Sequence, residues 1–134
     1  MTSAAHHLPI RVYYEDTDLG QVVYYANYLR FIERGRSEWL RSVGVDQTRL
    51  LADEGLVFVV RRVEADYLRP ARFDDLLDVV TAVAEVAGSR IELDQRVERD
   101  GTLLFQARVR MVCVDMAAMR PHRIPDTLRA ILGG

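Results

Sequence analysis

Three carboxylates and a glycine stand close together near the start of the chain. Glu15, Asp16 and Asp18 fall within four consecutive positions, and Gly20 follows after one residue. Apolar and aromatic residues flank this turn, and a long helical pattern begins directly after it. A carboxylate in such surroundings can act as a general base or as a nucleophile. The free N–H groups at the start of a helix can polarise a carbonyl group beside it.

Two other interpretations of this turn stay open on the residues alone. In the first, the aspartates cap the helix and interact favourably with its dipole. In the second, Asp16 and Asp18 bind a divalent metal ion, although no histidine lies near them and the spacing of an EF-hand is absent. In the catalytic interpretation, Gly20 allows a sharp turn and the close approach of a ligand to the backbone.

The elements that must hold this turn follow from the spacing of the apolar residues. Residues 8–14 are short, β-branched and aromatic, which predicts a first strand. Residues 25–43 carry apolar side chains at steps of three and four, which predicts one long helix, and Gly44 is typical of a helix C-terminus. Arg36 is the one break in the apolar stripe of that helix. Residues 125–132, with a proline in the first turn, predict a short closing helix.

Four further strands are predicted after residue 55. They cover residues 57–67, 76–86, 91–97 and 103–113, with turns at Gly88-Ser89 and Asp100-Gly101. In the first of them, Val57, Val59, Val63, Ala65 and Tyr67 share one apolar face, and Arg61 interrupts it. Short connections make neighbouring strands antiparallel. The sequence therefore predicts an α+β fold, an antiparallel five-stranded sheet wrapped around one long central helix. The open edges of so small a sheet favour pairing with a second subunit.

The composition is that of an ordinary globular domain. The 134 residues are 49% hydrophobic and 28% charged, with a formal net charge of -2, which predicts one domain over residues 1–134, with residues 1–7 as a mobile arm. All 18 basic residues are arginine, which excludes Schiff-base chemistry by a lysine. No basic excess indicates nucleic-acid binding. The single cysteine, Cys113, cannot form an internal disulfide, and no segment reads as a signal peptide or membrane span, so we expect a cytoplasmic protein that is not membrane-embedded.

Several segments of the chain resemble a known family. Tyr14–Tyr24, followed by Asn27-Tyr28, is similar to the signature of hotdog-fold acyl-CoA thioesterases. The resemblance is strongest to the 4-hydroxybenzoyl-CoA thioesterase group and its branch associated with the bacterial Tol-Pal envelope system. It continues through Glu33–Glu38, Tyr67–Asp75 and Val112–Asp115. The resemblance implies a hotdog fold, hydrolysis of an acyl-CoA to the free acid and CoA, no metal or cofactor, and a homodimer or homotetramer with active sites between subunits.

The resemblance also implies roles for individual residues. Asp18 would be the catalytic carboxylate, which either attacks the thioester or activates water. The main-chain N–H of Tyr25 would bind the thioester oxygen, and Tyr14 matches an aromatic position beside the aspartate. Many members of the Tol-Pal branch have histidine in place of Tyr25, whereas hydroxybenzoyl-type members have tyrosine and use its main-chain amide. The role of the Tyr25 side chain therefore stays open.

Residues expected to bind the substrate lie in the motif and near two arginine-containing turns. Gly20 and Val23 belong to the motif. Ser89 and Arg90 occupy the turn where hotdog thioesterases often contact the nucleotide. Arg120 and Arg123 could hold the phosphate groups of CoA through bidentate hydrogen bonds.

Two rival functions remain at this point. A hotdog dehydratase or hydratase usually pairs its acid with a histidine, and no histidine lies in or near the motif. A non-catalytic hotdog module, in envelope or lipid metabolism, would use the same groove to hold an acyl-carrier protein or an envelope partner. Such a binder should tolerate Asp18→Asn, and a hydrolase should not.

Overall fold

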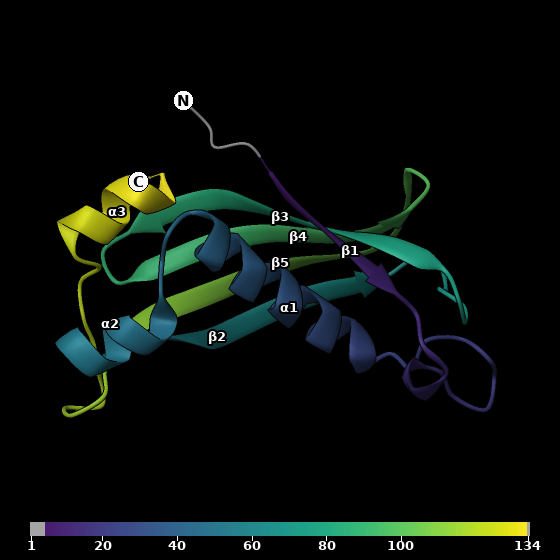
Figure 1. The fold of residues 1–134 in the computed structure, drawn as a ribbon, viewed down its shortest axis with the longest axis horizontal. Helices are drawn as coiled ribbons and strands as arrows, with labels where there is room; N and C mark the ends of the chain where they lie inside the picture. The colour runs from purple at the N-terminus through teal and green to yellow at the C-terminus, as the bar shows by residue number, and fades with distance from the viewer. Residues whose placement is uncertain (1–4, 134) are drawn as a thin grey trace.

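One long helix, α1 (Asn27–Ser42), lies across one face of a curved antiparallel sheet (Figure 1). The structure is a computed structural model that describes residues 5–133. The strands, in their order across the sheet, are β1 (His6–Arg11), β3 (Leu76–Ala87), β4 (Arg90–Arg99), β5 (Thr102–Asp115) and β2 (Leu56–Tyr67). The two-residue β6 (Arg120–Pro121) pairs with the end of β5. The predicted five-stranded sheet around a central helix is confirmed, and β6 is a small addition to it.

The apolar stripe of α1 faces the sheet. Phe31, Ile32, Trp39 and Leu40 are each at most 3% exposed and belong to the core. Gly35 lies where helix and sheet come closest, since a Cβ at this position would stand 2.8 Å from Cγ1 of Val79. The glycine therefore sets how closely α1 packs on the strands that lie beneath it.

Strand β2 changes its inward-facing side at a β-bulge. The register shifts between Val60 and Arg62, which leaves Arg61 as the extra residue. Phe58, which is paired with Cys113, packs against the core, whereas Val59 is 41% exposed. Beyond the bulge, Ala65 faces the core as predicted. The predicted apolar face is therefore wrong before Arg61, because an inserted residue inverts the alternation of the strand.

The N-terminal boundary also differs from the prediction. Strand β1 begins at His6 and pairs with β3, so residues 6 and 7 belong to the sheet rather than to a mobile arm. Residues 1–4 of the predicted arm lie outside the described residues. Strand β1 ends at Arg11, and Tyr14, the last residue of the predicted first strand, instead begins a 3-10 turn, Tyr14–Asp16. This turn reverses the chain toward the start of α1.

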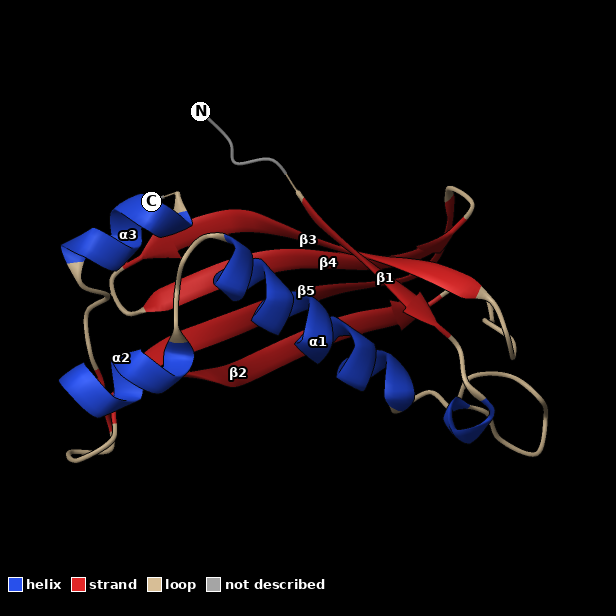
Figure 2. Cartoon of the chain, viewed as in Figure 1, coloured by secondary structure: helices blue, strands red, loops and turns tan. Residues whose placement is uncertain are grey.

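Two short helices cover one end of the sheet (Figure 2). Helix α3 (Asp126–Leu132) matches the predicted closing helix. Helix α2 (Gln47–Glu54) was not predicted. The side chain of Asp46 caps α2 by accepting a hydrogen bond from the Arg49 N–H at 3.1 Å, and Gly55 ends it with a φ of 68°. No helix within residues 5–133 is long and apolar enough to cross a membrane.

Candidate active site

The carboxylate motif forms a closed loop between β1 and α1, at the opposite end of the sheet from α2 and α3 (Figure 1). An isolated bridge pairs Thr17 with Val23 and brings the two sides of the loop together. Within the loop, Oδ1 of Asp18 accepts a hydrogen bond from the Gly20 N–H at 2.9 Å. The Asp18 carbonyl oxygen accepts another from the Gln21 N–H at 2.9 Å. The backbone of its own loop therefore fixes the position of the Asp18 carboxylate.

Gly20 serves this carboxylate by leaving space for it. A Cβ at position 20 would stand 3.2 Å from Oδ1 of Asp18, which is tighter than an ordinary contact. The residue with left-handed backbone is its neighbour Gln21, which has a φ of 64°. The predicted sharp turn is thus present, and Gly20 contributes close approach to the carboxylate rather than a positive φ.

Asp18 lines a hollow that we call the Asp18 hollow. It measures about 640 Å³ and is lined by Tyr14, Thr17, Asp18, Leu19, Gln21, Arg72 and Phe73. Tyr14 is 82% exposed, and its ring meets that of Phe73 edge-on at 6.2 Å. Tyr14 and Asp18 therefore line the same hollow. Arg72 is the one cationic residue in the lining.

The carboxylate of Asp75 holds the main chain of Arg72, which lines this hollow, in place. Oδ2 of Asp75 accepts hydrogen bonds from the Arg72 N–H at 2.8 Å and from Nη1 of Arg99 at 2.7 Å. Burial alone would raise the pKa of Asp75, but these two donors and the positive charges lower the pKa below its usual value. The segment that lines the hollow is thereby tied to strand β4.

Unbonded main-chain donors lie at the start of α1. The N–H of Tyr24 donates to the Asp16 carbonyl and that of Asn27 donates to the Tyr24 carbonyl. Between them, the N–H groups of Tyr25 and Ala26 find no acceptor among residues 5–133. The Tyr25 ring is 61% exposed and contacts the rings of Tyr24 and Tyr67, with centroid distances of 4.9 and 6.0 Å. The Tyr25 amide is thus free to donate to a ligand.

Neither aspartate caps α1. Oδ2 of Asp16 accepts its hydrogen bond from the Tyr13 N–H at 2.8 Å, and Asp18 is bonded to Gly20. The N-cap residue, Ala26, has no side-chain cap. The helix-capping interpretation is therefore wrong. In the described part of the chain, no group of three or more His, Cys, Asp or Glu side chains is arranged to hold a metal ion.

The predicted substrate-binding residues do not all reach the Asp18 hollow. Val23 is 4% exposed and packs in the core, so its side chain is unavailable to a ligand. This corrects the expectation from its place in the motif. Its main chain is occupied as well, because the Val23 N–H donates to the Ala71 carbonyl at 2.9 Å.

Ser89 and Arg90 lie at the other end of the sheet from Asp18. Ile124 N–H and Nη2 of Arg129 both donate to the Gly88 carbonyl, which ties this turn to the segment around α3. Helix α1, with 16 residues, spans about 24 Å between the two ends. A single chain therefore does not bring the expected catalytic and nucleotide-binding residues together.

The turn has a basic hollow of its own, which we call the Ser89 hollow. It measures about 420 Å³ and is lined by Arg61, Ala87, Gly88, Ser89, Arg90, Arg110 and Val112. Arg61, the bulge residue of β2, was missed as a candidate, although it broke the alternation of its strand. Arg120 and Arg123 are exposed and lie outside this lining, and Arg123 is 3.9 Å from Asp126.

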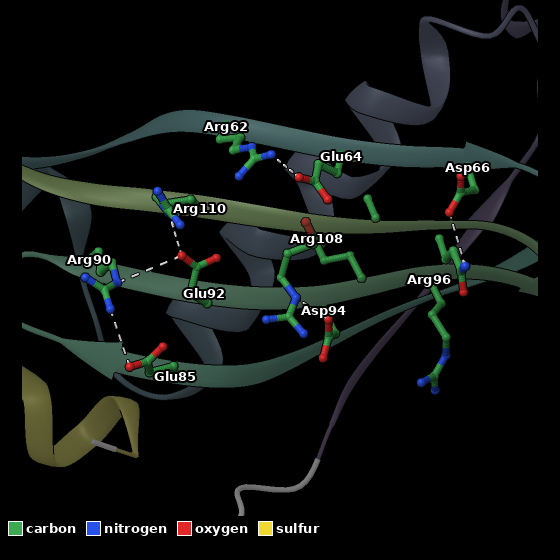
Figure 3. A pocket seen from close by; sticks show the side chains of 13 residues that line it. Arg62, Glu64, Asp66, Glu85, Arg90, Glu92, Asp94, Arg96, Arg108 and Arg110 are labelled. Carbon is green, nitrogen blue, oxygen red and sulfur yellow. Dashed lines mark hydrogen bonds and ion pairs between the residues drawn. The ribbon is translucent and has the colours of Figure 1, made fainter.

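A further hollow, of about 740 Å³, lies over charged side chains of β2 to β5 (Figure 3). Its charges pair with one another. Nε of Arg108 is 2.7 Å from Asp94, and Nε of Arg110 is 2.5 Å from Glu92. None of the motif residues lines it. Because its acids and bases neutralise each other, this surface offers no group poised for catalysis.

The fold is that of the hotdog thioesterases. A 1,4-dihydroxy-2-naphthoyl-CoA thioesterase from Synechocystis has the same fold, with a TM-score of 0.89 at 20% identity, over 97% of this chain and 96% of its own. A probable thioesterase from Bartonella henselae is 38% identical, with a TM-score of 0.84, over 91% of this chain and 100% of its own.

The sequence relatives define the family more closely. Residues 12–132 match the model of the thioesterase-like superfamily, and the chain belongs to that superfamily. An acyl-CoA thioesterase, YbgC, from Haemophilus influenzae is 47% identical over 122 residues, which cover 91% of this chain and 90% of the relative. The resemblance to hotdog acyl-CoA thioesterases of the Tol-Pal-associated branch is confirmed by this match.

Proposed function

We propose that the protein hydrolyses an acyl-CoA to the free acid and CoA. The observation that carries this proposal is that one segment between β1 and α1 contains both a positioned Asp18 carboxylate and the unbonded Tyr25 N–H. The relative from Haemophilus influenzae is itself named an acyl-CoA thioesterase. A dehydratase is disfavoured because the Asp18 hollow is lined by no histidine.

The chemistry needs little more than these two groups. The Tyr25 N–H donates to the thioester oxygen and stabilises the negative charge that develops there. In one route, Asp18 attacks the carbonyl carbon, the C–S bond breaks and CoA leaves as the thiolate, after which water cleaves the resulting anhydride. In the other route, Asp18 takes a proton from a water molecule that attacks the carbonyl carbon, the C–S bond then breaks, and the proton passes from Asp18 to the leaving CoA thiolate. Both routes return Asp18 to its starting carboxylate.

The proposal extends to a homodimer formed through the β2 edges. Strand β2 has only β5 as a neighbour among the described strands, and it is 12 residues long, with Val59, Val60 and Val63 exposed. Antiparallel pairing of two such edges joins opposite ends of the two sheets. The Ser89 hollow of one subunit then comes toward the Asp18 hollow of the other. In this arrangement Arg61 and Arg90 contact the phosphates of CoA.

The remaining expectations follow the same proposal. The acyl donor is a CoA ester or the thioester of an acyl-carrier protein, and the reaction takes place in the cytoplasm. Both donors end in the same phosphopantetheine thioester, so both fit one carboxylate and one amide donor. A homotetramer would add a second interface without changing the composite site.

Release of free thiol from short-chain, long-chain and benzoyl CoA esters tests this function. We expect turnover of at least one ester by the wild type and its collapse in Asp18→Asn. Equal turnover by both proteins would contradict the assignment of Asp18. Turnover of none of the esters, nor of an acylated carrier protein, would favour a module that binds and does not hydrolyse.

A further inference from the structure

The proposed reaction needs two groups that lie on different parts of the chain. Asp18 belongs to residues 13–24, which we call the Asp18 loop, and the free Tyr25 N–H lies at the start of α1 (Figure 1). Hydrogen bonds within the loop fix the Asp18 carboxylate relative to Gly20 and Gln21. They do not fix it relative to α1. A misplacement of about 1 Å can cost a reaction about a hundredfold in rate.

The start of α1 is itself held firmly. Tyr28 is 4% exposed, and its ring stacks on that of Phe105 with a centroid distance of 5.1 Å. The Tyr28 hydroxyl oxygen accepts a hydrogen bond from the Ala71 N–H at 3.0 Å. Burial raises the pKa of the Tyr28 hydroxyl, so it stays neutral at ordinary pH. The first turn of α1 is thus anchored to the core and to the segment that precedes Arg72.

Asn27, the first residue of α1, joins the Asp18 loop to this helix. Its side-chain Nδ2 donates to the Asp16 carbonyl oxygen at 2.9 Å, and its main-chain N–H donates to the Tyr24 carbonyl oxygen at 2.8 Å. In the described part of the chain, these two are the hydrogen bonds that connect α1 to the Asp18 loop. The main-chain bond closes the turn around Tyr25. The side-chain bond reaches the arm of the loop that carries Asp18.

The side-chain bond spans the two reacting groups. Asp16 lies two residues before Asp18, and Asn27 lies two residues after Tyr25. The Asp16 carbonyl also accepts a hydrogen bond from the Tyr24 N–H at 2.9 Å. A main-chain donor beside Tyr25 and the side-chain donor of Asn27 therefore meet on one oxygen of the carboxylate arm.

We propose that Asn27 is a positioning residue that holds the Asp18 loop in a fixed place relative to the Tyr25 N–H. Its effect on rate rests on the proposed hydrolysis, in which Asp18 and the Tyr25 N–H contact the substrate. A carboxamide suits this task because a carbonyl oxygen requires a donor. An ionised aspartate has the same shape, but it offers no donor.

Steady-state kinetics of Asn27→Ala test the proposal on the ester that the wild type hydrolyses best. We expect kcat to fall about ten- to a hundredfold with KM within about twofold of the wild type, because misplaced groups lose rate rather than binding. Ser42→Ala is the matched control. The Ser42 hydroxyl donates to the Trp39 carbonyl at 2.7 Å, so this variant loses the same kind of bond at the other end of α1. It should leave both constants unchanged.

Asn27→Asp adds a pH signature that a loss of stability would not produce. Its ionised carboxylate repels the Asp16 carbonyl, whereas the protonated form has an O–H that replaces the amide donor. We expect the ratio of its kcat to that of the wild type to rise as the pH falls from about 7 to about 5 and the new carboxyl group takes up a proton. The ratio for Asn27→Ala should not depend on pH. A ratio for Asn27→Asp that is equally independent of pH would contradict the donor role of Asn27.

Hydrogen exchange of main-chain amides tests the same bond without turnover. In Asn27→Ala, the Tyr24 N–H, which shares the Asp16 acceptor, should exchange several-fold faster than in the wild type, and in Ser42→Ala it should not. Wild-type exchange in Asn27→Ala would overturn the proposal. Loss of turnover in Asp18→Asn with full turnover in Asn27→Ala would also overturn it, and would leave the proposed hydrolysis standing. If the wild type hydrolyses no ester, the proposed hydrolysis fails, and the exchange rates decide whether Asn27 holds the loop.

Discussion

At the residue scale, the Asp18 carboxylate is positioned by its own loop. The Gly20 N–H holds one of its oxygens, and the glycine leaves room that a Cβ would take. Residue type and spacing indicated Asp18 and Gly20 as candidate site residues, because an acid and a glycine in one turn have a limited set of uses. Spacing could not indicate that Val23 is buried, since its neighbours across the loop, Thr17 and Ala71, are set by tertiary pairing.

The main-chain role of Tyr25 can be separated from its side chain. Tyr25→Ala keeps the N–H and removes the ring, whereas Tyr25→Pro removes both, and proline is tolerated at the first turn of a helix. We expect kcat in Tyr25→Pro to fall about 100-fold or more below that in Tyr25→Ala, because an oxyanion donor is lost. Steady-state kinetics on the best ester measure this ratio. A ratio near one would show that another group binds the thioester oxygen.

At the element scale, the packing of α1 on the sheet depends on a missing side chain. In Gly35→Ala, the new methyl group would stand 2.8 Å from Cγ1 of Val79 and 3.1 Å from Oγ1 of Thr81. Overpacking costs about 1–3 kcal/mol, which exceeds the helix preference for alanine of roughly 1 kcal/mol. We expect a loss of about 1–2 kcal/mol in the free energy of unfolding, measured in urea. Arg34→Ala, on the exposed side of α1, should change it by less than about 0.5 kcal/mol.

The segment of residues 72–75, just before β3, should lose stability in acid. The pKa of Asp75 is lowered in the folded state, so its carboxylate stabilises the fold at pH values above the ordinary aspartate pKa of about 3.9. That contribution disappears as the pH falls through the lower, folded-state pKa. We expect Asp75→Asn to cost about 1 kcal/mol at pH 7 and the two unfolding curves to converge in acid. A pH-independent difference between wild type and Asp75→Asn would show that the charge of Asp75 contributes nothing.

Element type was easier to predict than element detail. The long helix and the alternating strands follow from periodicity, which local sequence carries. The β-bulge at Arg61 does not follow from periodicity. One extra residue shifts the pairing register, and no other feature of the sequence marks that shift. Helix α2 was not predicted because it buries only Leu50 and so has little apolar periodicity, although its caps, Asp46 and Gly55, are typical helix boundaries.

At the scale of the whole molecule, one chain separates the two halves of the proposed site. The Asp18 hollow and the Ser89 hollow lie at opposite ends of the sheet. Both sets of residues could be predicted from the sequence, but the distance between them could not. A fold is recognisable from local patterns, whereas a composite site depends on how copies of the chain associate. Strand β2 is an edge strand of the described sheet, and we propose its edge for that association.

Mixed dimers test the composite site. Asp18→Asn removes the proposed catalytic carboxylate, and the double variant Arg61→Ala, Arg90→Ala removes the proposed phosphate contacts, so each homodimer should be slow. A co-expressed and purified mixed dimer contains one site without either change, and we expect about half the wild-type activity per dimer. If both sets of residues act within one chain, no intact site forms and no activity returns.

The most direct measurement is kcat/KM for thioester hydrolysis by wild type, Asp18→Asn and Glu15→Gln on the same ester. Glu15 is an exposed carboxylate three residues earlier in the same loop and lines no part of the Asp18 hollow. We expect Asp18→Asn to lose about 100-fold or more and Glu15→Gln to stay within about threefold of the wild type. Equal losses in both variants, or none in Asp18→Asn, would contradict catalysis by Asp18.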